Sequence, residues 1–333
     1  MERTALPKAK IHRLMRLATI ASTGTAFLLV LGKAVAYWMS GSTAVLGSLL
    51  DSVLDFAASL INMFAVRISL EDADAEHRFG HGKAEALGAL IQGGLISGSA
   101  VFLAIESIGK VLDPEPVTAA NIGILVMGGS IFVTVCLVMF QRYVVRRTGS
   151  VAIEADSLHY IGDVAVNGAV ILALVLGLVL DDALWLDPLF GFAIAIWLGK
   201  SAYDVFSTAV HQLMDHELPE PIRRQILENA VRVPRVSAVH DLRTRQSGVD
   251  TFIQLHVEVD GGMSLYQAHV IAETVEMEVE KVHPGADVLV HLDPAGAEDF
   301  VSERERVTLA DQTLSSGTGD AVDAADGAAG KGS

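Results

Sequence analysis

The chain has 333 residues, 51% of them hydrophobic, and its mean hydropathy is positive, which excludes an ordinary soluble enzyme and indicates a polytopic membrane protein. The formal net charge of -16 gives no indication of a nucleic-acid partner. The single cysteine, Cys136, has no partner for a disulfide or a thiolate metal site, so any metal site must use His, Asp and Glu.

Six apolar segments follow one another from the N-terminus, and each is long enough to cross a bilayer. They lie near residues 14–38, 43–68, 84–112, 119–142, 151–180 and 187–212. The basic N-terminus leads into a long apolar run without a small-residue cleavage site. We therefore interpret the first segment as a span and not as a removed signal peptide.

The distribution of Lys and Arg predicts the orientation of these spans. The N-terminal segment, the loop RISLEDADAEHRFGHGK and the loop QRYVVRRTGS are basic or mixed in charge. The alternate loops SGS, DPEPVTAAN and DDALWLD contain no Lys or Arg. The positive-inside rule then places both termini in the cytoplasm, as an even number of spans requires.

After Asp215 the pattern becomes that of a soluble α+β domain with the order αββαβ. We predict helices over 218–233 and 264–282, and strands over 236–246, 251–259 and 286–292. The predicted organisation is a transmembrane domain over 1–213, a cytosolic metal-binding domain over 214–294 and a disordered acidic tail over 295–333.

Two pairs of polar residues lie inside the apolar segments at a spacing of four. Asp51 and Asp55 share one face of the second segment, and His159 and Asp163 share one face of the fifth. An ionised carboxylate costs at least about 2.5–3.5 kcal/mol in hydrocarbon, so such residues indicate a functional site. Facing pairs would offer three carboxylates and an imidazole in the tetrahedral arrangement that suits Zn²⁺.

Three further polar residues of the spans are interpreted as supporting hydrogen-bond partners or as contacts between helices, namely Asn62, Asp156 and Asn167.

A second cluster lies in the loop DADAEHRFGHGK. Asp74, His77 and His81 converge if the loop folds back, and its glycines permit a tight backbone. Their spacing alone favours a metal site and a solvated loop equally.

A third cluster lies in the soluble domain. Alternation along the strands places His256 and His291 away from the apolar face. The candidate ligands for one or two ions are His240, His256, His269, His291 and Asp293. The alternative is that these are exposed polar positions on a sheet. No metal-ligand spacing involves His12, His211, His216 or His283.

The combination of these motifs resembles the cation diffusion facilitators, and specifically their bacterial zinc and iron efflux branch. The resemblance covers roughly residues 13–294 and rests on DSVLD, HYIGD, HRFGHGKAEALGAL, VHDLRTRQSG and HLDP. It implies a homodimeric metal/proton antiporter of the bacterial inner membrane, with six spans and a cytosolic domain like a metallochaperone. Such a protein is a transporter and not an enzyme.

The resemblance also implies roles for individual residues. The two span pairs would form the transport site, the loop triad a second site, and the five cytosolic residues a two-ion site near the dimer interface. Lys83 and Asp215 match a family salt bridge that holds the domains at the membrane surface. Leu292 departs from the family, which often has a polar residue between this His and Asp.

The physics of the transport site fits exchange by alternating access. Crowded carboxylates in a low-dielectric cavity favour protons, and a bound divalent cation reverses that preference. The donor set suits Zn²⁺ or Cd²⁺ and tolerates Fe²⁺, Co²⁺ or Mn²⁺. A metal-gated passive channel is the main alternative, and dependence of flux on a proton gradient discriminates the two. An intramembrane metal-dependent hydrolase is disfavoured, because the chain has neither an H-E-x-x-H motif nor a spare catalytic carboxylate beside the ligands.

Overall fold

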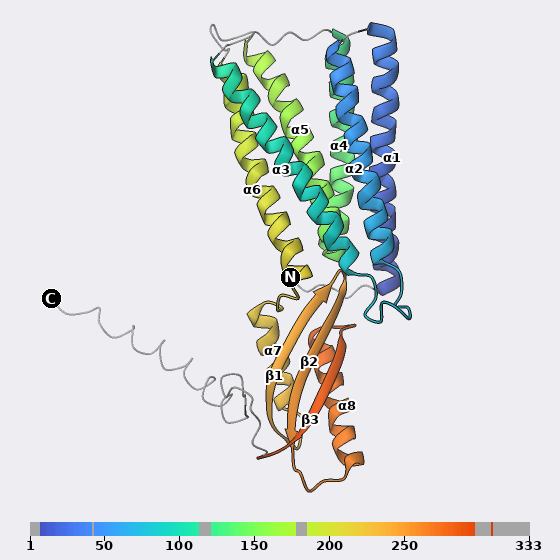
Figure 1. Cartoon of the computed structure of the whole chain (residues 1–333), viewed down its shortest axis with the longest axis vertical. Coiled ribbons are helices and arrows are strands. Elements are labelled where there is room, and N and C mark those ends of the chain that lie inside the picture. Colours follow the sequence, from blue (N-terminus) through green and yellow to red (C-terminus); the bar gives the residue numbers. More distant parts are fainter. Residues whose placement is uncertain (1–6, 42, 113–120, 178–184, 297–307, 309–333) are drawn as a thin grey trace, which may run out of the picture. The chain divides into compact units, whose positions relative to one another are not determined.

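The computed structural model describes residues 7–41, 43–112, 121–177, 185–296 and 308. The chain divides into two compact units, 1–214 and 215–333 (Figure 1). The predicted acidic tail over 295–333 falls almost entirely outside the described residues, as do most of the loops DPEPVTAAN and DDALWLD.

Among the residues that the structure describes, six long helices make up the first unit. They are α1 (Lys8–Ser40), α2 (Thr43–Ser69), α3 (Lys83–Leu112), α4 (Asn121–Thr148), α5 (Val151–Gly177) and α6 (Leu186–Leu213). Within the described residues, all of these except α5 contain a stretch long and apolar enough to be a membrane span. α5 has 27 residues, or about 40 Å at about 1.5 Å per residue, which exceeds a hydrocarbon core of about 30 Å. The prediction of a helical transmembrane domain is therefore confirmed.

The helices extend beyond the apolar segments from which they were predicted. α1 begins at Lys8 and α4 continues to Thr148 through the charged sequence QRYVVRRT. Charged and polar residues propagate a helix once it is nucleated, so hydropathy marks the apolar part of a helix and not its ends.

Several small residues are fully buried inside this unit, whereas many of its large apolar side chains are exposed. Ala86 and Ala89 are fully buried, whereas the exposed fraction is 64% for Leu28, 68% for Phe102 and 71% for Phe132. Cys136 on α4 is exposed as well. A soluble protein would bury its large apolar side chains, and this distribution instead suits helices surrounded by lipid.

Glycines allow close approach where the site-bearing helices pack on their neighbours. A Cβ atom at Gly88 of α3 would lie 2.6 Å from Cβ of Ala65 on α2. One at Gly162 of α5 would lie 2.8 Å from Leu198 Cδ2 on α6. Figure 1 shows α3, α5 and α6 side by side, and α2 also contacts α5. These contacts pack α2 on α3 and α5 on α6, and the two helices that carry the polar pairs, α2 and α5, also contact each other.

The second unit is a small α+β domain. Its elements are α7 (Glu220–Val231), β1 (Val236–Ser247), β2 (Asp250–Val259), α8 (Leu265–Val282) and β3 (Asp287–Pro294), in the predicted αββαβ order. The sheet has the order β1-β2-β3, with β1 antiparallel and β3 parallel to β2. Parallel strands need a crossover connection, and α8, which lies between β2 and β3 in the chain, provides it.

Both helices of this domain pack on the sheet and on each other. Ile226 of α7, Leu255 of β2 and Val275 of α8 lie in one buried apolar core. Ser264 begins α8 with a capping box, since its Oγ accepts from the backbone N–H of Gln267 and the Gln267 side chain accepts from the Ser264 N–H. The opposite face of the sheet is left for polar side chains.

Candidate metal-binding sites

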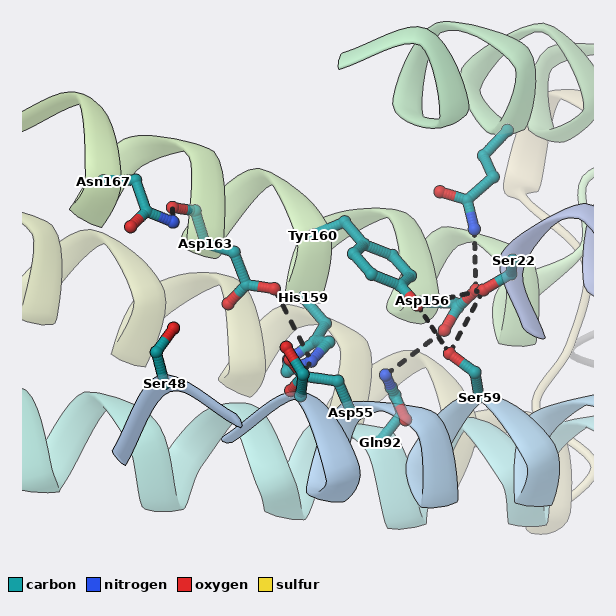
Figure 2. A network of polar contacts seen from close by, with 12 residues as sticks. Ser22, Ser48, Asp55, Ser59, Gln92, Asp156, His159, Tyr160, Asp163 and Asn167 are labelled. Atoms are coloured by element: carbon teal, nitrogen blue, oxygen red, sulfur yellow. Dashed lines mark hydrogen bonds and ion pairs between the residues drawn. The ribbon is translucent and has the colours of Figure 1, made fainter. Parts of the chain in front are cut away.

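Asp55 of α2 and the His159–Asp163 pair of α5 converge inside the first unit. His159 Nε2 lies 3.0 Å from Asp55 Oδ1 and 3.9 Å from Asp163 Oδ2. One ligand atom from each residue lies within 4.8 Å of the others. Figure 2 shows Asp55 of α2 pointing toward His159, with Asp163 one turn further along the helix that carries His159. Two carboxylates and an imidazole at these distances can close around a divalent cation with small side-chain movements.

Asp51, the fourth predicted ligand, lies outside this compact group. It lines the same cavity of about 470 Å³ as Asp55, His159 and Asp163. Lys33 of α1 lines that cavity too, although we did not predict it from the sequence. A lysine within the apolar run LVLGKAVAYW was the signal that could have found it.

Asp156, one turn before His159, is the centre of a buried hydrogen-bond network (Figure 2). Ser22 Oγ and Gln141 Nε2 each donate to Asp156 Oδ2 at 2.6 Å, and Gln92 Nε2 donates to Oδ1 at 3.4 Å. The network continues through Ser59 Oγ, which lies 2.7 Å from the Tyr160 hydroxyl and 3.2 Å from Ser22 Oγ. Asp156 therefore connects α5 directly to three other helices, and the network reaches α2 through Ser59.

The other polar neighbours of the pairs bind the backbone. Asn62 Nδ2 donates to the Ala152 carbonyl at 3.2 Å and thereby joins α2 to α5. Asn167 Nδ2 donates to the Asp163 carbonyl of its own helix at 2.8 Å. Sequence reasoning identified these residues but missed Glu85, which is buried and accepts from the Ala152 N–H at the start of α5.

The loop between α2 and α3 brings the three predicted residues together. Asp74 Oδ1 lies 3.3 Å from His77 Nδ1, and Asp74 Oδ2 lies 3.4 Å from His81 Nε2. The backbone N–H groups of His77 and Glu76 donate to Asp74 Oδ1 at 2.6 Å and 2.8 Å. These hydrogen bonds, that of His77 foremost, lower the pKa of Asp74. Gly80, with φ of +76°, completes the turn that returns His81 to Asp74.

Three of the predicted cytosolic histidines form a row across the sheet of the second unit. His240 pairs with His256 in the β1–β2 register, and His256 pairs with His291 in the β2–β3 register. Their ring centroids are 5.3 Å and 4.5 Å apart. The register thus explains how residues far apart in the sequence reach one place.

Asp293 provides the carboxylate of this row. Its Oδ2 lies 2.8 Å from His256 Nδ1 and 3.4 Å from His240 Nε2, while its Oδ1 lies 3.2 Å from His291 Nε2. His240 is buried, yet neither of its ring nitrogens makes a hydrogen bond to a described residue. A buried imidazole whose ring nitrogens make no hydrogen bond within the described part of the chain is suited to binding a cation together with the neighbouring Asp293 and His256.

The fifth predicted cytosolic ligand, His269, lies outside this group. It is on α8, it is exposed, and its Nε2 lies 3.4 Å from Glu273 Oε1 of the same helix. Sequence reasoning missed two carboxylates beside the row. Glu258 Oε1 lies 3.5 Å from His240 Nδ1, and Asp241 Oδ2 lies 3.6 Å from His256 Nε2. The signal for Glu258 was its position two residues after His256, on the same face of β2.

Lys83 and Asp215, the predicted salt bridge, belong to different units. Within the first unit, Lys83 Nζ donates to the Leu213 carbonyl at 3.3 Å. Within the second, Asp215 Oδ1 lies 3.6 Å from Arg245 Nη1. Their pairing stays a prediction. Leu292 packs against the apolar core of the second unit.

Two family models match most of the chain. Residues 19–214 match the model of the cation efflux transmembrane domain, and residues 218–295 match that of the cytoplasmic domain of cation efflux proteins. The chain is 46% identical to the cation-efflux pump FieF of Cronobacter sakazakii over 285 residues, which are 85% of this chain and 93% of that protein. FieF of Klebsiella pneumoniae is also 46% identical, over 85% of this chain and 94% of its own. A solved structure of CzrB in a zinc form is 30% identical and covers 26% of this chain and 99% of its own, with a TM-score of 0.24.

Proposed function

Because the chain belongs to the cation efflux family, the cation diffusion facilitators, and is a multi-pass membrane transporter of divalent metal cations, we propose that it exports Zn²⁺ from the cytoplasm in exchange for protons. The observation that carries this proposal is the group of Asp55, His159 and Asp163 between two helices of the transmembrane unit. Families of this kind move ions and do not transform substrates.

The ligand set favours a borderline metal ion as the cargo. An imidazole nitrogen beside carboxylate oxygens suits Zn²⁺, whereas an all-oxygen site would favour Mg²⁺, Ca²⁺ or Mn²⁺. Asp51, which lines the same cavity, would supply the fourth ligand after a side-chain movement. Cd²⁺, Fe²⁺, Co²⁺ and Mn²⁺ would compete for the same atoms, because selectivity depends on geometry and availability more than on affinity.

Proton exchange follows from the chemistry of these ligands. Each carboxylate and the imidazole must present a lone pair to the metal, so a proton on any of those atoms competes with the cation. Zn²⁺ entering from the cytoplasm would release protons, and protons entering from the other side would release Zn²⁺. Movement of α2 and α5 relative to the remaining helices would open the cavity to each side in turn.

The remaining clusters support a regulatory assembly. We place both termini in the cytoplasm of a bacterial inner membrane and propose that the chain works as a homodimer. Asp74, His77 and His81 would form a loop site, and the row of His240, His256, His291 and Asp293 would bind cytosolic metal, with His269 completing it in the dimer. Metal binding there would favour whichever arrangement of the dimer binds it more tightly.

Transport by purified protein in liposomes tests the proposal. Zn²⁺ uptake should accelerate with an opposing proton gradient and should be accompanied by proton counterflow. Asp55→Ala should remove both signals while leaving the protein folded, because the substitution deletes a ligand from a cavity and not a packing residue. Asn167→Ala is the matched control, since Asn167 lines the same cavity but its side chain binds backbone.

The alternative is a passive channel in which the acidic cavity conducts divalent cations. Equal Zn²⁺ flux with the proton gradient collapsed, and no proton signal, would favour the channel. Near-normal flux in Asp55→Ala would show that the cargo does not bind at this group.

A further inference from the structure

Lys33 is a charged residue in the apolar part of α1, where a lysine requires a partner or a polar cavity. It lines the cavity that also holds Asp51, Asp55 and Asp163. The nearby carboxylates favour the charged form of its ammonium. The cavity that receives a divalent cation therefore already contains a cation of the protein.

Two hydrogen bonds fix this ammonium on α2. Lys33 Nζ donates to Ser52 Oγ at 2.6 Å and to the Ser48 carbonyl at 3.1 Å. Ser52 is buried and directly follows Asp51 in the chain. The lysine thus reaches from α1 to the same turns of α2 that carry the carboxylates, and it is held beside the candidate ligands without replacing one.

The net charge of the cavity determines how Lys33 affects the binding of a divalent cation. Three ionised carboxylates and one ammonium leave two negative charges, which a single divalent cation neutralises. We propose that Lys33 is a resident counter-charge of the cavity, which weakens its hold on the divalent cation enough for the cation to leave. In this role Lys33 places a positive charge beside the metal ligands and does not itself bind the metal. The role rests on the proposed function.

Removing the ammonium should strengthen metal binding and slow release. With three carboxylates and no counter-charge, the cavity keeps a net negative charge around the bound ion, and electrostatic attraction in a medium of reduced polarity is large. The concentration for half-maximal flux should therefore fall. The maximal rate should fall too, because the bound state is stabilised more than the state that releases the ion.

Initial rates of Zn²⁺ transport in liposomes at about pH 8, above the ordinary range of carboxyl and imidazole groups, measure both quantities. Lys33→Gln and Lys33→Met, which remove the charge, should lower the half-saturating Zn²⁺ concentration about tenfold or more and lower the maximal rate. Lys33→Arg, which keeps the charge, should stay near the wild type. Calorimetric titration with Zn²⁺ should show the same order of affinities.

Lys110→Gln is the matched control. Lys110 lies on α3 and pairs with Asp187 at 3.0 Å, in a different cavity. Its loss should leave the half-saturating concentration unchanged.

Three outcomes would overturn the inference. They are an unchanged half-saturating concentration in both neutral variants, equal effects in Lys33→Arg and the neutral variants, and neutral variants that fail to fold, which would assign the lysine to assembly. Absence of Zn²⁺ flux in the wild-type protein would instead contradict the proposed function, so the two failures are distinguishable.

Discussion

At the scale of single residues, the i, i+4 spacing of the two polar pairs predicted most of the candidate transport site. Spacing places side chains on one helical face, and it led to Asp55, His159 and Asp163. It could not predict that Asp51 would lie outside the group. The exact distance between two side chains depends on the rotation of each helix about its axis and on side-chain rotamers, which spacing does not determine. Lys33 was missed because a single lysine has no periodic pattern.

His159 is the residue that should decide which metals the site prefers. His159→Asp replaces the nitrogen ligand by oxygen, so discrimination in favour of Zn²⁺ should weaken and Mn²⁺ should gain relatively. Initial rates for Zn²⁺ and Mn²⁺ in liposomes measure the ratio. An unchanged ratio would show that His159 does not bind the cargo directly.

The pKa of the Asp74 carboxyl group should lie below that of an ordinary aspartate. Backbone N–H donors stabilise its ionised form, so its pKa in the folded loop is lowered. The ionised Asp74 carboxylate therefore stabilises the folded loop at pH values above the ordinary aspartate pKa of about 4. This stabilisation is lost as the pH falls through the lowered pKa of the folded state. Carbon NMR of the Asp74 carboxyl against pH would show this, with an unstructured loop peptide as the reference. Identical midpoints in protein and peptide would contradict the hydrogen bonding described.

At the scale of elements, the strands illustrate what alternation can and cannot predict. Alternation correctly assigned His256 and His291 to the polar face, opposite Leu255 and Val290. It did not predict the register shift between His240 and Arg243, where Asp241 adopts a φ of +47°. Such a bulge depends on how two strands pair with each other, and the sequence pattern of a single strand carries no information about that pairing.

The network around Asp156 should be a major stabilising contact between helices. Asp156→Leu leaves Ser22 and Gln141 without their acceptor, and each buried polar group left unsatisfied costs about 1–3 kcal/mol. The variant should unfold at a clearly lower temperature in detergent, and Asp156→Asn should lose less. Asn167→Ala, which removes a hydrogen bond within one helix, should change little. Equal unfolding temperatures for all three variants would remove Asp156 from this role.

At the scale of the whole molecule, hydropathy and periodicity predicted the helical transmembrane unit and the αββαβ order of the second unit. These patterns arise from burial, which a sequence records directly. The mixed sheet follows only when α8 is recognised as a crossover between β2 and β3. The relation of Lys83 to Asp215 rests on family resemblance, because no local pattern joins residues of separate units.

The second unit should fold and bind metal without the first. Its apolar core is built from its own residues between Leu218 and Leu292. A fragment of residues 215–296 should therefore give a cooperative unfolding transition, dimerise, and bind Zn²⁺ in calorimetry. Asp293→Ala should weaken binding more than His269→Ala, because Asp293 contacts three histidines whereas His269 is exposed. A folded fragment that binds no Zn²⁺ would contradict the cytosolic site.

The exposed position of Cys136 on α4 gives the chain a built-in reporter. It is the only thiol of the sequence, so a spin label or fluorophore attaches at one known place without prior mutagenesis. In an assembly of two identical copies, the labels would form a single pair. Their separation, followed as Zn²⁺ or protons are added, would measure how far the fourth helices of the two copies move during a transport cycle.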